Sequence, residues 1–123
     1  MEDIDSLRFA LSLHEFSLVK LQPHFPGYPI FCFIAKILYS FTGNMGISFA
    51  LIGGLSVFII IYYSLKICKT DPISYTGLFI TVLLFINPLI WLMGNRYMPD
   101  LMGLGILITV SYTHLTLATN REV

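Results

Sequence analysis

The chain has 123 residues, of which 56% are hydrophobic and only 11% are charged, and its formal net charge is zero. A soluble domain carries about 25% charged residues, so a chain this apolar is expected to fold in a membrane rather than in water. Without net charge there is no electrostatic basis for binding nucleic acid, and we exclude that class of function.

Residues 1–27 form the first predicted unit, an outer loop that contains a short helix. Five residues recur at helical spacing within residues 1–21, which predicts an amphipathic helix outside the bilayer core; they are Leu7, Ala10, Leu11, His14 and Leu18. Asp5 or Ser6 is expected to cap this helix. Arg8 follows Asp5 by one turn, an arrangement that is also typical of an ordinary surface ion pair.

A proline-rich hinge leads to the second unit. Residues 22–29 read QPHFPGYP, and prolines at this density cannot continue a helix, so the hinge should deliver a water-facing segment to the membrane. Residues 28–43 are then predicted as an apolar helix that is too short for a span, which needs roughly 20 residues. Lys36 in its middle favours a helix lying in the membrane interface over a tilted span with a buried lysine.

Residues 44–110 form the predicted transmembrane region, and residues 46–67 are its clearest span. This run carries no charge before Lys66 and is long enough to cross the hydrocarbon core. Its small residues are expected to form a face for close helix packing; they are Ser48, Gly53, Gly54 and Ser56.

Two further membrane segments are predicted after a turn at Asp71-Pro72. Residues 74–94 form a second full span, which Asn87-Pro88 should kink because proline removes one backbone hydrogen bond. A third span begins at Leu101 and stays apolar only to Val110. The expected fold class is therefore an all-α membrane protein with an outer amphipathic helix, an interfacial helix, two full transmembrane helices and the start of a third.

Residues 111–123 depart from this pattern. They read SYTHLTLATNREV, are rich in hydroxyl side chains, and resemble translated adapter sequence at the end of a metagenomic gene fragment. We therefore expect residues 111–123 to be a non-native tail, and we do not treat His114 as a ligand.

The positions of Lys and Arg predict how the segments are oriented in the membrane. Lys66 and Lys69 are dense around one short loop, which favours the cytoplasmic side for that loop. The extracytoplasmic face then receives residues 1–27 and the link at residues 95–100. Four polar residues would share that face: Asp5, His24, Arg96 and Asp100.

Three motifs occur in a characteristic order. They are Asp5-Ser6-Leu7-Arg8-Phe9-Ala10, the hinge at residues 22–29, and Tyr97-Met98-Pro99-Asp100-Leu101. Together they resemble the start of the polytopic C-type (GT-C) glycosyltransferases, which include protein O-mannosyltransferases and lipid A aminoarabinose transferases. The likeness covers residues 1–110 and is nearest to bacterial members whose loop reads His-Pro-Pro-Gly-Tyr-Pro; here Phe25 replaces the first of those prolines.

The resemblance implies a hexosyltransferase-like enzyme with an incomplete GT-C fold. Such enzymes move a sugar from a polyprenyl-phosphate donor to a lipid, glycan or protein acceptor, with inversion, on the outer face of the cell (inner) membrane. Their further helices and soluble domain have no counterpart here, so we expect these residues to be an N-terminal fragment that is inactive alone.

The resemblance also assigns site residues. Asp5 takes the role of general base, with Asp3 as the fallback, and Asp100 matches the second acid. His24 would lie near the donor phosphate, and the further substrate-binding candidates are Arg8, Tyr28 and Arg96. A divalent metal is a candidate cofactor because some members use one, but no ligand for it is assigned.

Simpler interpretations remain open at this point. Asp100 is also what a helix start favours, Arg8 is also a partner for Asp5, and Tyr28 is also a typical interface anchor. The alternative function is a small multipass membrane protein without enzymatic activity, such as a transporter subunit or an assembly factor. A sugar or lipid transporter fragment fits less well, because it would need charged or broken-helix residues near the bilayer midplane, and of these the predicted spans offer only Asn87-Pro88.

Overall fold

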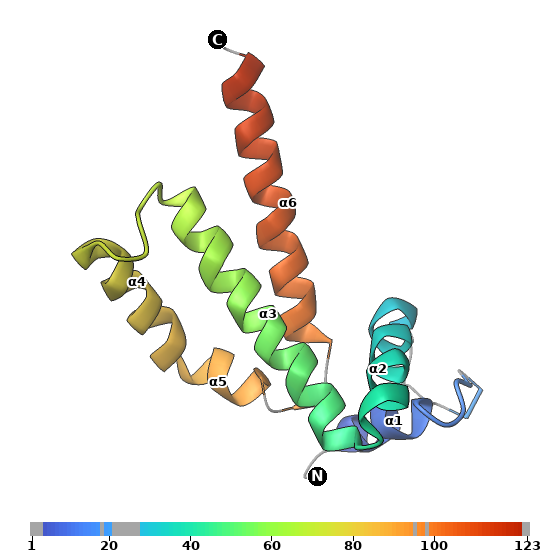
Figure 1. The fold of residues 1–123 in the computed structure, drawn as a ribbon. Coiled ribbons are helices and arrows are strands. Elements are labelled where there is room, and N and C mark those ends of the chain that lie inside the picture. Colours follow the sequence, from blue (N-terminus) through green and yellow to red (C-terminus); the bar gives the residue numbers. More distant parts are fainter. Residues whose placement is uncertain (1–3, 18, 21–27, 95, 98, 122–123) are drawn as a thin grey trace.

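The computed structural model describes residues 4–17, 19–20, 28–94, 96–97 and 99–121. Its regular structure is helical: α1 (Ile4–Ser12), α2 (Pro29–Thr42), α3 (Met45–Ile67), α4 (Tyr75–Ile86), α5 (Pro88–Gly94) and α6 (Asp100–Arg121). Figure 1 shows α3 and α6 as two long neighbouring helices, with α4 and α5 on the other side of α3. The all-α prediction is confirmed for these residues.

Within the described residues two helices are long and apolar enough to cross a membrane, and the bent pair of α4 and α5 would make a third if it forms one span. The two long helices are α3, with 23 residues, and α6, with 22 residues. At 1.5 Å per residue each is roughly 33–35 Å long, against a hydrocarbon core of about 30 Å. The chain is therefore a membrane protein. Helix α2 has 14 residues and falls short of that thickness, and its place in the interface stays a prediction.

Helix α3 packs against α6 through small residues. The Ser56 side chain is buried, and its hydroxyl donates to the Ile52 carbonyl at 2.8 Å instead of projecting toward α6. On the facing helix, a Cβ added at Gly105 would lie 3.7 Å from the Ser56 carbonyl oxygen, which is ordinary van der Waals contact. The two backbones approach closely because neither residue places bulk between them.

Helix α3 meets α5 at a second small-residue contact. A Cβ added at Gly53 would overlap the carbonyl oxygen of Gly94, so this crossing admits only glycine. Gly54 is exposed, and a Cβ there would meet nothing within 4 Å. The predicted packing face is therefore confirmed for Ser48, Gly53 and Ser56, which are buried, and wrong for Gly54.

The predicted kink at Asn87-Pro88 is confirmed, and it is larger than a bend within one helix. The chain ends α4 at Ile86, starts α5 at Pro88 and turns by 59° between them. Asn87 closes one helix by donating from its backbone to the Leu83 carbonyl at 3.2 Å. It opens the next by accepting from Leu89 N at 3.0 Å. Residues 74–94 therefore form two helices separated by a sharp bend, and by length and composition this bent pair still qualifies as one broken span.

The end predicted for the third segment at Val110 is not observed. Helix α6 continues to Arg121, and it is the second full-length helix of the fold. Its hydroxyl side chains stay compatible with a helix because they donate to carbonyls three or four residues earlier. Examples are Ser111 to Leu107 at 2.8 Å and Thr119 to Leu115 at 2.9 Å. The non-native origin of residues 111–123 stays a prediction.

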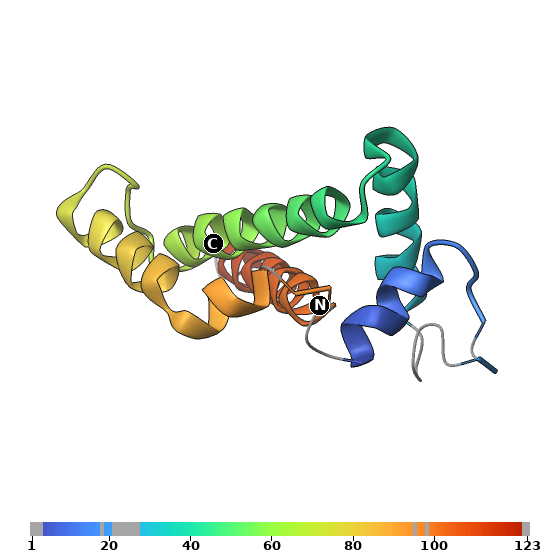
Figure 2. The same ribbon diagram turned by 90° about the horizontal axis from the view of Figure 1, so that it is seen from below.

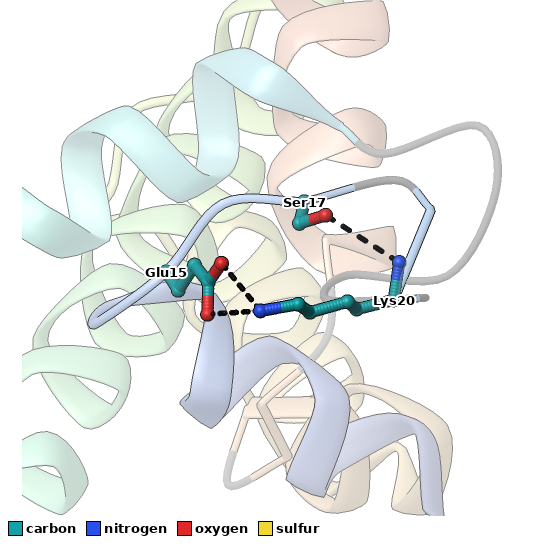
Figure 3. A network of polar contacts seen from close by, with 3 residues as sticks. All are labelled: Glu15, Ser17 and Lys20. Atoms are coloured by element: carbon teal, nitrogen blue, oxygen red, sulfur yellow. Dashed lines mark hydrogen bonds and ion pairs between the residues drawn. The ribbon is translucent and has the colours of Figure 1, made fainter.

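Helix α1 is shorter than the helix predicted over residues 1–21, because it ends at Ser12. The Ser12 hydroxyl donates to the Phe9 carbonyl at 2.6 Å, and such back-bonding competes with helix continuation. Beyond it the chain folds back, as Figure 3 shows, where the Lys20 ammonium contacts both carboxylate oxygens of Glu15 at 2.7 and 2.9 Å.

The buried face of α1 also differs from the predicted one. Leu7 and Leu11 are exposed, and Leu18 lies outside the described residues. Of the other predicted members, Ala10 is buried and His14 is exposed. The packed side of the helix is formed by Ser6, Phe9 and Ala10, and Leu13 continues it just beyond the end of α1. Asp5 lies within the first helical turn and is not the cap that was predicted.

The two ends of α3 carry different parts of the chain. Figure 1 shows α1 and the chain between α5 and α6 toward the end where α3 begins, and the connection from α3 to α4 at the opposite end. Figure 2 shows α2 crossing the beginning of α3 and α1 lying against α2. Asp71 and the outer-loop candidate Asp5 therefore lie at opposite ends of the fold.

Candidate functional site

A continuous run of aromatic rings joins the segments at the beginning of α3. The Tyr28 ring lies 5.9 Å from the Phe9 ring, measured between centroids, and Phe9 meets Phe31 edge-on at 5.3 Å. Phe31 lies 5.7 Å from Phe49, which stacks on Tyr97 at 4.5 Å. Each such pair contributes about 0.5–1.5 kcal/mol beyond the area it buries. The run fixes α1, the start of α2 and the link before α6 to one another through α3.

Tyr28 has an unusual backbone at the start of α2. Its φ of 41° and ψ of 61° are left-handed, a conformation that costs a residue with a side chain roughly 1–2 kcal/mol. Pro29 at the first helical position favours this abrupt entry because its φ is already helical. The Tyr28 carbonyl accepts from Cys32 N at 3.1 Å, and the contact with Phe9 holds the ring.

A pocket lies where the start of α2 faces the start of α6. Residues 28–31 form one wall, and Pro99, Asp100 and the next two turns of α6 form the other. Its volume is ≈ 410 Å³, within the range of about 300–1,000 Å³ usual for small-molecule sites. The lining is apolar apart from the Asp100 carboxylate and the Tyr28 hydroxyl. The space beside Gly103 is open, since a Cβ added there would meet nothing within 4 Å.

The structure thus brings together two of the predicted site residues, Tyr28 and Asp100. Asp100 is exposed in the first turn of α6, where a carboxylate also interacts favourably with the helix dipole. Both predicted roles of Asp100, helix-start acid and pocket residue, are compatible with this position.

Asp5 and Arg8 form a separate pair on α1. Arg8 Nη1 lies 3.6 Å from Asp5 Oδ1, and both side chains are partly exposed. Neither residue lines the pocket, but Phe9 follows Arg8 directly and touches Tyr28. Exposed ion pairs of this kind are worth at most about 1 kcal/mol.

The remaining candidates lie outside the pocket or outside the described residues. Arg96 is exposed in the link before α6, and its backbone N–H donates to the Met93 carbonyl at 3.3 Å. His24 and Asp3 lie outside the described residues. Among the residues that the structure describes, no three His, Cys, Asp or Glu side chains gather closely enough to hold a metal ion. The candidate divalent metal therefore has no ligand set assigned.

The sequence did not single out the aromatic run. Phe31 and Phe49 lie in apolar stretches where any ring could equally face lipid. Helical spacing from Phe9 to Leu13 was a usable signal, but the leucine spacing at Leu7 and Leu11 outweighed it. The sequence indicates Tyr97 only as part of a motif. Its contact with Phe49 depends on tertiary structure and could not be predicted from the sequence.

Comparison with known proteins gives no match for this chain: none among protein-family models, curated proteins or solved structures. The resemblance to C-type glycosyltransferases therefore rests on the three sequence motifs.

Proposed function

We propose that this chain belongs to an integral membrane glycosyltransferase that moves a sugar from a polyprenyl-phosphate donor to an acceptor at the extracytoplasmic face. The observation that carries the proposal is the pocket shared by Tyr28 and Asp100. These residues come from two of the three motifs, and the third motif reaches the same place through the contact of Phe9 with Tyr28. Convergence of the ordered motifs at one end of the fold is what the enzyme class requires.

The proposed chemistry is a single displacement. The Asp5 carboxylate removes the proton from the acceptor hydroxyl while that oxygen attacks the anomeric carbon. The bond between the anomeric carbon and the phosphate oxygen breaks, and polyprenyl phosphate leaves with the electron pair. His24, Arg8 or Arg96 would stabilise the leaving phosphate, because developing negative charge is best met by a fixed donor or cation.

The pocket lining favours particular roles within this scheme. Its apolar walls suit the isoprenoid part of the donor, which is hydrocarbon. A carboxylate repels a phosphate at short range, so Asp100 is expected to hold hydroxyl groups of the sugar or the acceptor. In the other arrangement Asp100 would help to hold a divalent metal, which would supply charge stabilisation for the leaving phosphate.

Photoaffinity labelling tests the pocket directly. The chain in lipid nanodiscs is irradiated with a diazirine-bearing polyprenyl phosphate, and the labelled residues are located by mass spectrometry. We expect labels within residues 28–31 and 99–106, with competition by unlabelled polyprenyl phosphate. Gly103→Leu should reduce labelling several-fold, because leucine fills the open space there. The matched control Gly54→Leu, also open but outside this pocket, should not.

Two results of that experiment contradict the donor site. One is labelling that polyprenyl phosphate does not displace, and the other is labelling confined to the groove between α3 and α5. Either would favour the non-enzymatic multipass protein instead.

The orientation in the membrane is tested by the two natural cysteines. Cys68 is exposed just after α3, on the loop proposed to be cytoplasmic. Cys32 is buried, and this burial raises the pKa of its thiol, while a hydrogen bond from the Ser12 hydroxyl at 3.4 Å opposes part of that rise. Because the thiolate is the reactive form, Cys32 should react slowly from either side.

We therefore expect a charged, membrane-impermeant maleimide to label Cys68 in inside-out vesicles and not in intact spheroplasts. Cys68→Ser should abolish the signal from inside-out vesicles. Labelling of Cys68 in intact spheroplasts would reverse the proposed orientation and move the pocket to the cytoplasmic face.

A further inference from the structure

Helix α2 exposes an apolar face that is only partly covered by the described part of the chain. Large side chains point outward along its whole length; the exposed fractions are 67% for Ile30, 66% for Phe33, 41% for Ile37 and 83% for Phe41. In water such a face would be costly, since each fully exposed large side chain forgoes about 1.5–3 kcal/mol of burial. The face suits hydrocarbon, and the helix is too short to cross a membrane.

Lys36 interrupts this face with one positive charge. It is exposed, and among the described residues it makes no ion pair or hydrogen bond. Lys20 differs, because the Glu15 carboxylate 2.7 Å away neutralises it, as Figure 3 shows. An unpaired ammonium among apolar side chains is suited to binding an anion that lies at the edge of a hydrocarbon layer.

A cavity lies directly beside Lys36. It has a volume of ≈ 240 Å³, and its walls are Ser12, Phe16, Pro29, Cys32, Phe33 and Lys36. This is below the usual size of about 300 Å³ or more for a site that encloses a whole small molecule. It suits one part of a larger ligand whose remainder lies along the exposed face of α2.

We propose that Lys36 binds the phosphate of an anionic phospholipid, whose glycerol and first acyl carbons occupy the cavity between α1 and α2. The charge selects an anion, and the flanking phenylalanines select a molecule that is apolar next to that anion. A free phosphate satisfies only the charge, and an acidic peptide satisfies the apolar face poorly. The cavity shares only Pro29 with the Tyr28–Asp100 pocket, and the proposal does not depend on the proposed function.

Cys32 provides a local readout for the proposal. Its sulfur lines the cavity, so a lipid seated there should shield it from a small thiol reagent. The chain carrying Cys68→Ser is placed in nanodiscs of phosphatidylcholine, with or without phosphatidylglycerol, and reaction with methyl methanethiosulfonate is timed by mass spectrometry. We expect phosphatidylglycerol to slow the reaction about five-fold, the effect of roughly 1 kcal/mol for one lysine near an anionic surface.

Charge variants assign the effect to Lys36. Lys36→Gln should remove the difference between the two lipids, Lys36→Arg should keep it, and Lys20→Gln should keep it because that charge is already paired. Circular dichroism of each variant reports folding. If Lys36→Gln does not fold, the Cys32 reaction rate with and without phosphatidylglycerol still tests the proposal. It is then measured in the Cys68→Ser chain and in Lys36→Arg.

Three outcomes overturn the proposal. One is an equal Cys32 rate in both lipids, and another is protection that survives in folded Lys36→Gln. The third is equal protection by inorganic phosphate or by an acidic peptide in phosphatidylcholine alone, since either would show that the lipid is not what the site selects.

Discussion

Replacing Asp5 with asparagine should lower sugar transfer by about 10²–10⁴-fold, the contribution typical of a general base. Asparagine keeps the size of the side chain but cannot accept the proton from the acceptor hydroxyl. The pair with Arg8 is partly exposed and weak, so its loss should leave folding and membrane insertion nearly unchanged. The measurement is release of polyprenyl phosphate by the protein encoded in the complete reading frame that contains these residues, at matched expression.

Asp71→Asn is the matched control. Asp71 is also an exposed aspartate, but it lies in the turn after α3, at the opposite end from α1. Turnover should be unchanged in this variant. Wild-type turnover by Asp5→Asn would remove Asp5 as the base and leave Asp3 as the acid to test next.

Gly53→Ala should destabilise the fold by about 1–3 kcal/mol, the usual cost of forcing extra atoms into a packed contact. The added methyl group would overlap the Gly94 carbonyl oxygen, and a backbone atom cannot rotate away as a side chain can. Helix α5 must therefore move off α3. Trp91, the single tryptophan of the chain, lines the groove at this contact, so its fluorescence should shift with unfolding in mixed micelles.

Gly54→Ala separates this packing effect from helix propensity. Its added methyl group meets nothing within 4 Å, so the variant should be neutral or stabilised by up to about 1 kcal/mol through the better helix propensity of alanine. Equal behaviour of the two variants would contradict the close crossing of α3 and α5.

The sequence was sufficient for features that depend on local chemistry. The apolar run of α3, the short α2 and the break at Asn87-Pro88 each follow from composition or from proline within a few residues. Helix ends were harder to predict. Ser12 donates a side-chain hydrogen bond to a preceding carbonyl where α1 ends. Ser111 donates the same kind of bond within α6, which continues past it. This side-chain chemistry therefore does not by itself predict where a helix ends.

Tertiary contacts were beyond reach for a physical reason. In a membrane chain nearly every helical face is apolar, so hydrophobic periodicity no longer marks the packed side. That is why Gly53 and Gly54 could not be told apart, and why Leu7 and Leu11 were preferred to Phe9 and Leu13. For the site, the charge distribution predicted which segments share one end, but not that Tyr28 and Asp100 would line one pocket.

The most direct test of the central claim is donor turnover measured with defined sidedness. Sealed vesicles of known orientation carrying the complete protein are given a polyprenyl-phosphate sugar and an acceptor, and released polyprenyl phosphate is counted. The proposed function predicts release only where the end of the fold that carries Asp5 and Asp100 faces the acceptor. No release from any polyprenyl-phosphate sugar in either orientation would contradict the assignment as a glycosyltransferase.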